Sequence, residues 1–212
     1  MKIAVFGGTG RIGSRIVAEA AQRGHEVTAL SRRAATATAT ATAGGRWQQA
    51  DATDPASVAT VAADHDAVVS ALGPSREPGG DPSAFVSVVR GLADAVGSSS
   101  RLLVVGGAGS LLAETGVRLV DLPEFPAEYR AESLAQADAL EVLRSAPAGL
   151  DWSYLSPAPE IGPGRRIGSY VVGTDQPVGG FISFDDFAVA VIDELEQRNH
   201  QRVRFTVAQP AA

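Results

Sequence analysis

The 212-residue chain contains no cysteine, which excludes disulfide bonds, thiolate metal ligands and cysteine nucleophiles. Its three histidines, His25, His65 and His200, are scattered along the sequence, so we expect no metal site. No apolar run reaches the length of a membrane span, and the first apolar run follows Met1 without a charged and apolar leader. A net charge of −6 offers no basic surface to a nucleic acid. These absences predict a cytoplasmic protein that binds neither membranes nor nucleic acids.

The rest of the composition is typical of a globular protein. Apolar residues make up 45% of the chain, enough to bury the core of one domain of this length. Short apolar runs alternate with segments of helical pattern, which favours an α/β fold whose mainly parallel sheet is covered by helices on both faces. We therefore expect a single doubly wound domain over residues 1–212, in which residues 156–182 contribute a small C-terminal lobe on the substrate side.

The patterns place the elements as follows. Strands are expected at residues 3–6, 27–30, 46–49, 67–72, 102–105, 150–155 and 203–207. Helices are expected at residues 11–23, from Pro55 onward, and at 82–96, 127–144 and 183–197, with Asp54 and Ser183 as N-terminal caps. Alternating apolar positions around residues 170–172 predict a hairpin and loops within 160–182.

The first apolar run leads directly into a glycine-rich turn and then into a helical segment. Gly8, Gly10 and Gly13 satisfy the spacing G-x-G-x-x-G, and Gly7, Gly10 and Gly13 satisfy G-x-x-G-x-x-G. Such glycines let the backbone turn tightly and approach a pyrophosphate, and the N-terminus of the following helix favours the anion. Because the run at 27–30 completes a β-turn-α-β unit, the context predicts a dinucleotide site rather than a glycine-rich turn without a ligand. The predicted contacts are Gly7, Gly8, Thr9, Gly10, Arg11, Ile12 and Gly13.

The end of the second strand indicates which dinucleotide binds. An NAD site usually has an acidic residue here, which accepts hydrogen bonds from the ribose 2′-hydroxyl, whereas this strand ends Leu30-Ser31-Arg32-Arg33. A guanidinium can bind a 2′-phosphate through two hydrogen bonds, so we expect NADP(H) in preference to NAD(H), held by Arg32 first and Arg33 second. The alternative is that both arginines are solvated loop charges. The Ala/Thr repeat at 34–43 offers little apolar surface, and we expect it to be a mobile loop beside the adenosine.

Four further loops, at residues 31–33, 71–75, 106–110 and 156–164, are expected to converge with the glycine turn, because ligands of parallel sheets bind beyond the carboxyl ends of the strands. Asp51 follows the third strand, where its carboxylate either accepts a hydrogen bond from the adenine amino group or is simply a turn residue. The other predicted cofactor contacts follow the third, fourth, fifth and sixth strands and are Ala52, Ala71, Leu72, Gly73, Gly106, Gly107 and Pro157.

These motifs, in this order, resemble the short-chain dehydrogenase/reductase superfamily, and within it the small atypical proteins that are NmrA-like, flavin-reductase-like or biliverdin-IXβ-reductase-like. The glycine turn is shared by many families, whereas the ordered set spans almost the whole chain. The resemblance implies a Rossmann domain that holds NADP(H) at the strand ends, with a small C-terminal substrate lobe. The motifs that carry it are GGTGRIG at 7–13, DATD at 51–54, VVSALG at 68–73, VVGGAGS at 104–110, DWSYLSP at 151–157, GPG at 162–164 and ISFDDFA at 182–188.

The chain departs from this superfamily in its catalytic residues. The usual Ser-Tyr-Lys chemistry needs a lysine that lowers the pKa of the tyrosine, and the only lysine here, Lys2, lies at the wrong end of the first strand. No Tyr-x-x-x-Lys occurs: Tyr129 opens the expected helix, but Ser133 stands four residues later. Tyr154 is better explained as core packing within a strand, and Tyr170 falls in the expected hairpin.

Without that pair, the resemblance favours direct hydride transfer from NADPH to a flavin or another conjugated acceptor, quinone-like or tetrapyrrole, with a proton from solvent. Ser110 matches the superfamily's serine position and would hydrogen-bond the substrate or the nicotinamide, unless it is a turn residue. Tyr129 is a further candidate, as a proton donor. Two alternatives stay open, a non-catalytic NADP(H)-sensing regulator and a nucleotide-sugar epimerase or dehydratase. The expected partner is a small planar organic acceptor, bound by a monomer or a homodimer.

Overall fold

The computed structural model describes residues 1–32, 44–75 and 80–210. Its centre is an eight-stranded sheet in the order β3-β2-β1-β4-β5-β6-β10-β8, and β7 and β9 form a second, two-stranded sheet. The strands are β1 (Lys2–Phe6), β2 (Glu26–Ser31), β3 (Arg46–Gln49), β4 (Ala67–Ser70), β5 (Arg101–Val105), β6 (Trp152–Ser156), β7 (Glu160–Gly162), β8 (Val171–Gly173), β9 (Phe181–Ser183) and β10 (Val203–Ala208).

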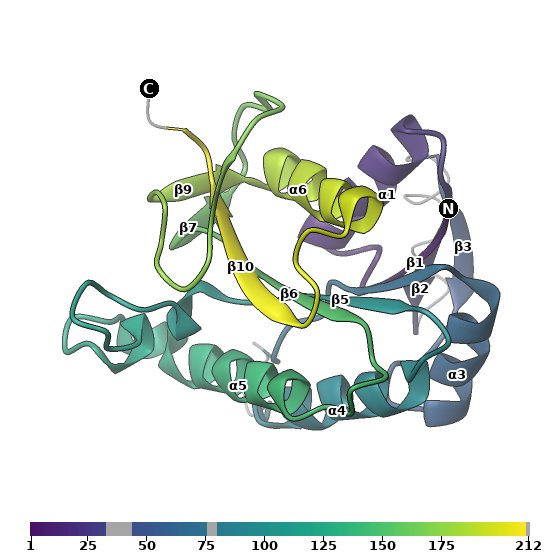
Figure 1. The fold of residues 1–212 in the computed structure, drawn as a ribbon, viewed down its shortest axis with the longest axis horizontal. Helices are drawn as coiled ribbons and strands as arrows, with labels where there is room; N and C mark the ends of the chain where they lie inside the picture. Colours follow the sequence, from purple (N-terminus) through teal and green to yellow (C-terminus); the bar gives the residue numbers. More distant parts are fainter. Residues whose placement is uncertain (33–43, 76–79, 211–212) are drawn as a thin grey trace.

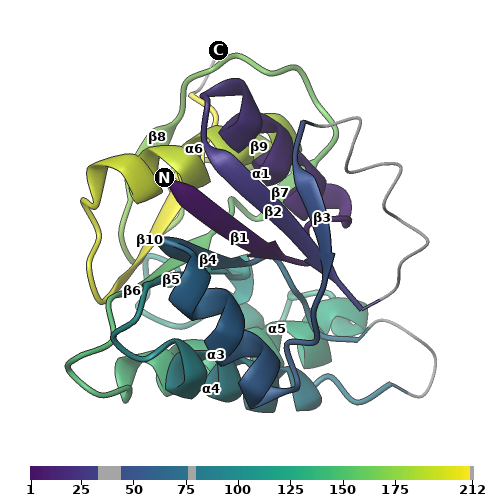
Figure 2. The same cartoon turned by 90° about the vertical axis from the view of Figure 1, so that its right-hand side faces the viewer.

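Helices cover both faces of the large sheet, as Figures 1 and 2 show. α1 and α6 lie on one face, and α3, α4 and α5 lie on the other. This is the doubly wound, mainly parallel α/β fold that the sequence predicts. The helices are α1 (Arg11–Gln22), α3 (Pro55–Asp64), α4 (Ala84–Val96), α5 (Ala127–Arg144) and α6 (Phe184–Gln197), with short 3-10 helices η2 (Ala108–Ser110) and η3 (Leu119–Asp121).

The sheet divides the core in two, because successive residues of a strand point to opposite faces. Ile3 and Val5 of β1 pack with α1 and α6, whereas Ala4 and Phe6 pack on the side of α3, α4 and α5. All four are at most 2% exposed. A parallel sheet covered on both faces needs nearly continuous apolar runs, which is why short runs of this kind predict its strands.

The order of the strands reverses between β1 and β4. β2 and β3 lie on one side of β1, and β4, β5, β6 and β10 lie on the other, and all seven strands are parallel. At the carboxyl ends of the two central strands, Phe6 pairs with Ser70. Doubly wound sheets bind their ligands outside this edge, at this reversal. The glycine turn that follows Phe6 therefore stands at the expected position for a cofactor.

Two predicted helix caps are confirmed. The Asp54 carboxylate accepts a hydrogen bond from the backbone N–H of Ala56 at 3.0 Å, with Pro55 as the first helical residue of α3. The Ser183 hydroxyl accepts one from the backbone N–H of Asp186 at 3.0 Å. The Ser183 hydroxyl in turn donates to the Asp186 carboxylate at 2.9 Å, and that carboxylate also accepts the backbone N–H groups of residues 167 and 168, so the acid has a tertiary role beside the serine cap.

The predicted hairpin within residues 160–182 is wrong. β7 and β9 pair with each other in parallel, and β8, which lies between them in sequence, pairs antiparallel with β10 at the edge of the large sheet. β8 is an edge strand in which the neighbouring Val171 and Val172 are both exposed, so its apolar residues do not mark a buried face. A hairpin requires adjacent strands to pair locally, whereas here each short strand finds a partner that is distant in sequence.

Candidate cofactor site

The turn after β1 is tightly packed at three of its glycines. Gly7 has a φ of +74°, and a Cβ on it would lie 2.7 Å from the carbonyl oxygen of Ala71. A Cβ on Gly8 would lie 2.8 Å from the Cβ of Ala29 in β2, and one on Gly13 would lie 2.1 Å from the carbonyl oxygen of Gly7. Any side chain at these positions would displace the backbone, so the sequence brings β1, β2, β4 and α1 together in a turn made of bare backbone.

α1 begins at this turn without a side-chain cap. Its N-cap residue is Gly10, and its first turn contains no acidic residue. The first N–H groups of a helix have no partner within the helix, and together with the helix dipole they favour a bound anion. Thr9, Arg11 and Ile12 lie in the same segment. A turn without side chains that opens an uncapped helix fits the pyrophosphate of a dinucleotide, as the glycine spacing predicts.

The end of β2 brings Arg32 and Asp51 to one corner of the molecule. Arg32 is exposed, and its backbone oxygen accepts a hydrogen bond from Gln49 in β3 at 3.3 Å. Asp51 accepts two hydrogen bonds from Thr53, one from its N–H and one from its hydroxyl. These bonds, followed by the nearby charge of Arg32, lower the pKa of Asp51. Asp51 thus has the contacts of a turn residue, and it also stands beside the candidate phosphate-binding arginine.

Two of the sequence predictions for the adenosine end lie outside the described residues. These are Arg33, the second candidate for the 2′-phosphate, and the repeat at 34–43. Ala52, the residue after Asp51, is buried.

The loops after β4, β5 and β6 line the same edge of the sheet. Ala71 donates its N–H to the carbonyl of Phe6 at 2.9 Å, which ties the loop that contains Leu72 and Gly73 to the glycine turn. Gly106 is packed on the ring of Tyr154, and Gly107 on the side chain of Gln136. After β6, the buried Pro157 accepts a hydrogen bond from Thr206 of β10 through its carbonyl oxygen at 3.4 Å.

The three tyrosines have different surroundings. Burial raises the pKa of Tyr154, whose hydroxyl donates to the Gln136 carbonyl at 2.8 Å and accepts from the N–H of Gly107. Burial, followed by the hydrogen bond to Asp193 and the charge of that carboxylate, raises the pKa of Tyr170. Tyr129 is 53% exposed at the start of α5. Tyr154 and Tyr170 are therefore structural phenols that stay protonated, the first in the core as expected.

Ser110 has a partner that the sequence patterns did not predict. It ends η2, directly after the loop that follows β5, and is 7% exposed. Its hydroxyl oxygen accepts a hydrogen bond from Nη1 of Arg204 in β10 at 3.3 Å. Residues 203–207 read Val-Arg-Phe-Thr-Val, an alternation that is typical of a half-exposed strand, so the sequence carries no signal that Arg204 is buried.

A family profile described as "NAD(P)H-binding" matches residues 7–198 of the chain. The chain belongs to this NAD(P)H-binding family. The matched range begins at the glycine turn and extends through β6 to the end of α6, so it includes each of the loops at the carboxyl edge.

Three relatives align with essentially the whole length of this chain. "Uncharacterized protein YwnB" of Bacillus subtilis is 38% identical, over 100% of both chains. A crystal structure of a "putative exported protein" from Burkholderia pseudomallei is 42% identical with a TM-score of 0.86, over 98% of this chain and 99% of that one. A crystal structure of a "putative NADH-flavin reductase" from Streptococcus pneumoniae is 32% identical with a TM-score of 0.88, over 99% and 100% of the two chains. The fold is thus shared with both crystal structures over nearly the whole of each chain.

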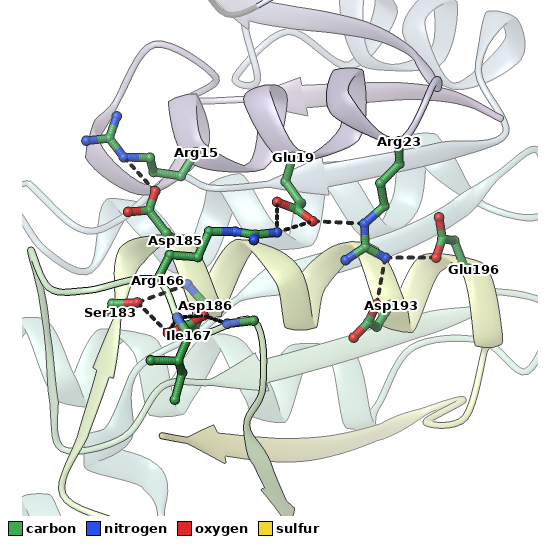
Figure 3. A network of polar contacts seen from close by, with 11 residues as sticks. Arg15, Glu19, Arg23, Arg166, Ile167, Ser183, Asp185, Asp186, Asp193 and Glu196 are labelled. Carbon is green, nitrogen blue, oxygen red and sulfur yellow. Dashed lines mark hydrogen bonds and ion pairs between the residues drawn. The ribbon is translucent and has the colours of Figure 1, made fainter. Parts of the chain in front are cut away.

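An ion pair and backbone hydrogen bonds fix residues 166–168 to α1 and α6 (Figure 3). Glu19 of α1 is buried and accepts hydrogen bonds from Arg23 and from Arg166, each at 2.9 Å. Asp186 of α6 accepts the backbone N–H groups of Ile167 and Gly168 at 3.0 and 2.8 Å. Residues 166–168 are thereby held against α1, the helix that opens at the glycine turn.

A polar cavity of about 300 Å³ lies at the opposite edge of the sheet. Its lining includes Asp66, Ser100, Arg101 and Asp151, which stand at the amino ends of β4, β5 and β6. It is therefore separate from the cofactor edge. In the described parts of the chain, no helix combines the length and the hydropathy that a membrane span needs.

Proposed function

We propose that this protein is an NADPH-dependent reductase that transfers hydride to a flavin or another conjugated acceptor, quinone-like or tetrapyrrole. The observation that carries the proposal is a nucleotide cradle at the carboxyl edge without the tyrosine-lysine pair of carbonyl reductases. Lys2, the only lysine, begins β1 at the opposite edge, and Tyr154 is buried and hydrogen-bonded in the core. An acceptor that delocalises the incoming electron pair needs no acid of that kind, because water supplies the proton.

The position of each residue indicates its role in the proposed reaction. The bare turn at Gly7, Gly8 and Gly13 would hold the pyrophosphate, and Arg32 would hold the 2′-phosphate. The reduced nicotinamide supplies the hydride when it is bound. Pro157 and Ala158, both buried after β6, would bound the site with apolar surface, and Ser110 would donate a hydrogen bond to the acceptor. A small planar acceptor, a cytosolic location and a monomeric or homodimeric state belong to the same proposal.

The preference for NADPH is supported by the end of β2. Ser31 and Arg32 stand where an NAD site has a carboxylate, and Asp51, the nearby acid, is occupied by Thr53. The Streptococcus relative is named for NADH, so cofactor choice needs a direct test. Calorimetric titration with NADPH and NADH is expected to give at least tenfold tighter binding of NADPH, and Arg32→Ala is expected to remove that difference while leaving NADH binding unchanged. Tighter binding of NADH by the unaltered protein would overturn the preference.

The reaction is tested by stopped-flow oxidation of NADPH with a panel of acceptors. We expect single-turnover oxidation with riboflavin, FMN or a soluble quinone, and no reaction with a simple aliphatic ketone, which needs an acid at its carbonyl oxygen. Tight NADPH binding without turnover on any acceptor would instead favour the NADP(H)-sensing regulator. Turnover of a nucleotide sugar without net NADPH oxidation would favour the epimerase.

A further inference from the structure

Arg204 is a buried cation at the back of the candidate site. Its side chain is 2% exposed, and it is the second residue of β10, between the apolar residues Val203 and Phe205. It pairs in register with Tyr154 of β6, so both side chains point toward the α5 face. Burying a guanidinium is unfavourable unless it is paired and hydrogen-bonded, so its partners indicate why it is there.

Those partners lie on two sides of the guanidinium. On the outer side is Asp175, whose carboxylate is 54% exposed and accepts hydrogen bonds from Nε at 3.1 Å and from Nη2. On the inner side is the buried hydroxyl of Ser110, which accepts from Nη1. The backbone carbonyl of Asp175 also accepts the N–H of Leu112 at 2.8 Å, so the segments on either side of this cation are joined.

We propose that Arg204 is a positioning residue that acts through Ser110, orienting its hydroxyl and placing a positive charge behind the acceptor where negative charge develops on reduction. This inference rests on the proposed reductase function. It identifies the class of acceptor more closely, as one that presents a conjugated carbonyl oxygen or ring nitrogen to Ser110.

The geometry accounts for the direction of the hydroxyl. Because Nη1 of Arg204 donates to Oγ of Ser110, one lone pair of that oxygen is occupied and its own hydrogen is turned away from the guanidinium. In the described part of the chain this hydroxyl has no acceptor of its own, so it can donate to a ligand. A donor that itself accepts a charge-assisted hydrogen bond is polarised and becomes stronger.

The surroundings also make the positive charge of Arg204 more effective toward Ser110 than toward Asp175. Water screens the attraction between Arg204 and the half-exposed Asp175, whereas the path from the guanidinium to Ser110 is buried. In the reduction, NADPH transfers a hydride, a hydrogen with its electron pair, to the acceptor and becomes NADP⁺. The electron pair that is displaced onto the conjugated oxygen or nitrogen of the acceptor then takes a proton from water. Before that proton arrives, the hydroxyl of Ser110 and the charge of Arg204 stabilise the anion, as preorganised donors do at other sites of developing charge.

The test compares two substitutions that break the same ion pair. Arg204→Met removes the cation, and Asp175→Asn keeps the cation but removes its counter-charge. If Arg204 only fastens residues 174–176 to the sheet, both changes weaken the protein in the same way. If its charge acts on Ser110, the two changes act in opposite directions on any ligand that becomes negative.

The first readout is equilibrium binding. Anaerobic titrations measure the dissociation constants of oxidised and reduced riboflavin in the presence of NADP⁺, at a pH where the reduced ring is an anion. We expect the unaltered protein to bind reduced riboflavin about tenfold more tightly than oxidised riboflavin. Arg204→Met is expected to lose that preference and Arg204→Lys to retain most of it. Asp175→Asn is expected to retain or increase it. The rate of single-turnover NADPH oxidation, the second readout, is expected to follow the same order while the dissociation constant of NADPH stays within about twofold.

The outcomes separate this inference from the proposed function. The role of Arg204 is overturned, and the reductase function stands, if Arg204→Met reduces riboflavin or a quinone as well as the unaltered protein does. The same holds if Asp175→Asn and Arg204→Met both lose the preference for reduced riboflavin. If the unaltered protein binds NADPH but neither binds nor reduces any acceptor, the proposed function fails and this inference fails with it. Should Arg204→Met not fold by circular dichroism, the direction of the change in Asp175→Asn decides the matter.

Discussion

The backbone of Gly13 in α1 is packed against the carbonyl group of Gly7, with so little space that a Cβ on Gly13 would stand 2.1 Å from the Gly7 oxygen. This contact fixes where the helix begins relative to the end of β1. It explains why the third glycine of the motif is needed even though residue 13 lies within the helix, where glycine is intrinsically unfavourable. The helix start, and with it the candidate phosphate site, depends on that absence of a side chain.

Gly13→Ala is therefore expected to displace the turn. We predict a loss of stability of about 1–3 kcal/mol from overpacking, measured by urea unfolding, and at least a tenfold loss of NADPH affinity, measured by calorimetry. Gly91→Ala in α4 is the matched control, because a Cβ there meets nothing within 4 Å. It is expected to stabilise the protein by about 0.5–1 kcal/mol and to leave NADPH binding unchanged. Equal behaviour of the two variants would contradict this account of the turn.

Tyr154→Phe tests whether the core supports the loop after β5. The change removes a hydroxyl that joins the Gln136 carbonyl to the N–H of Gly107, and it leaves that buried N–H without this acceptor. We expect a loss of stability of about 1–3 kcal/mol and a several-fold weaker affinity for NADPH, because Gly107 lies at the cofactor edge. Tyr170→Phe removes a hydroxyl bound to Asp193 of α6 and is expected to leave the affinity unchanged. If the two variants bind NADPH alike, the Gly107 loop does not contact the cofactor as predicted.

Elements with strong local signals could be predicted from the sequence almost residue by residue. β3 at Arg46–Gln49 and α5 at Ala127–Arg144 have the predicted bounds, and α3 begins at Pro55 under its Asp54 cap. For α5 the apolar period, and for α3 the capping chemistry, lies within or next to the element itself, whereas β3, Arg-Trp-Gln-Gln, has no such pattern. The glycine turn can be predicted for the same reason, because the motif and its strand-helix context are contiguous, whereas the family resemblance rests on the ordered set of motifs along almost the whole chain.

The remaining features depend on partners that are distant in sequence. β7 and β9 are three residues each and pair across the segment that contains β8, so their pattern could not indicate which strand they meet. Arg204 and Ser110 are 94 positions apart, and Glu19 and Arg166 are 147 apart. The burial of a charge at an alternate position of a strand, and the residue that it pairs with, are known only once the chain is folded.

Asp186→Asn is predicted to change how stability depends on pH. Burial acts to raise the pKa of Asp186, but the hydrogen bonds from Gly168, Gln209, Ser183 and Ile167 outweigh it, so the pKa lies below its ordinary value. A depressed pKa means that the unfolded state takes up the proton first. The stabilisation is therefore complete above the unfolded pKa of about 3.9 and is lost as the pH falls through the lower pKa of the folded state.

The variant should then be less stable than the unaltered protein at pH 7 by about 1–3 kcal/mol, and the difference should shrink below about pH 4. Urea unfolding at a series of pH values from neutral to acid measures this difference. Asp121→Asn is the control, because its carboxylate is exposed and its pKa is lowered by Arg118 on the surface. We expect little change in stability from that substitution, and a pH-independent difference for Asp186→Asn would show that its charge is not what holds residues 167 and 168.

Glu19→Gln tests the buried end of the network in Figure 3. Glu19 is 6% exposed and accepts hydrogen bonds from Arg23 and Arg166, so the amide leaves two cations without their buried counter-charge. We expect a loss of about 1–3 kcal/mol in urea unfolding, together with faster hydrogen exchange at residues 166–168, because Arg166 is what ties them to α1. The Arg15–Asp185 pair joins α1 to α6 at 3.0 Å, but its side chains are 52% and 37% exposed. Arg15→Ala is accordingly expected to change stability by no more than about 0.5–1 kcal/mol and to leave exchange at 166–168 unaltered. Comparable effects of the two substitutions would mean that burial does not distinguish these ion pairs. Residues 166–168 would then be held by their backbone contacts to Asp186 alone.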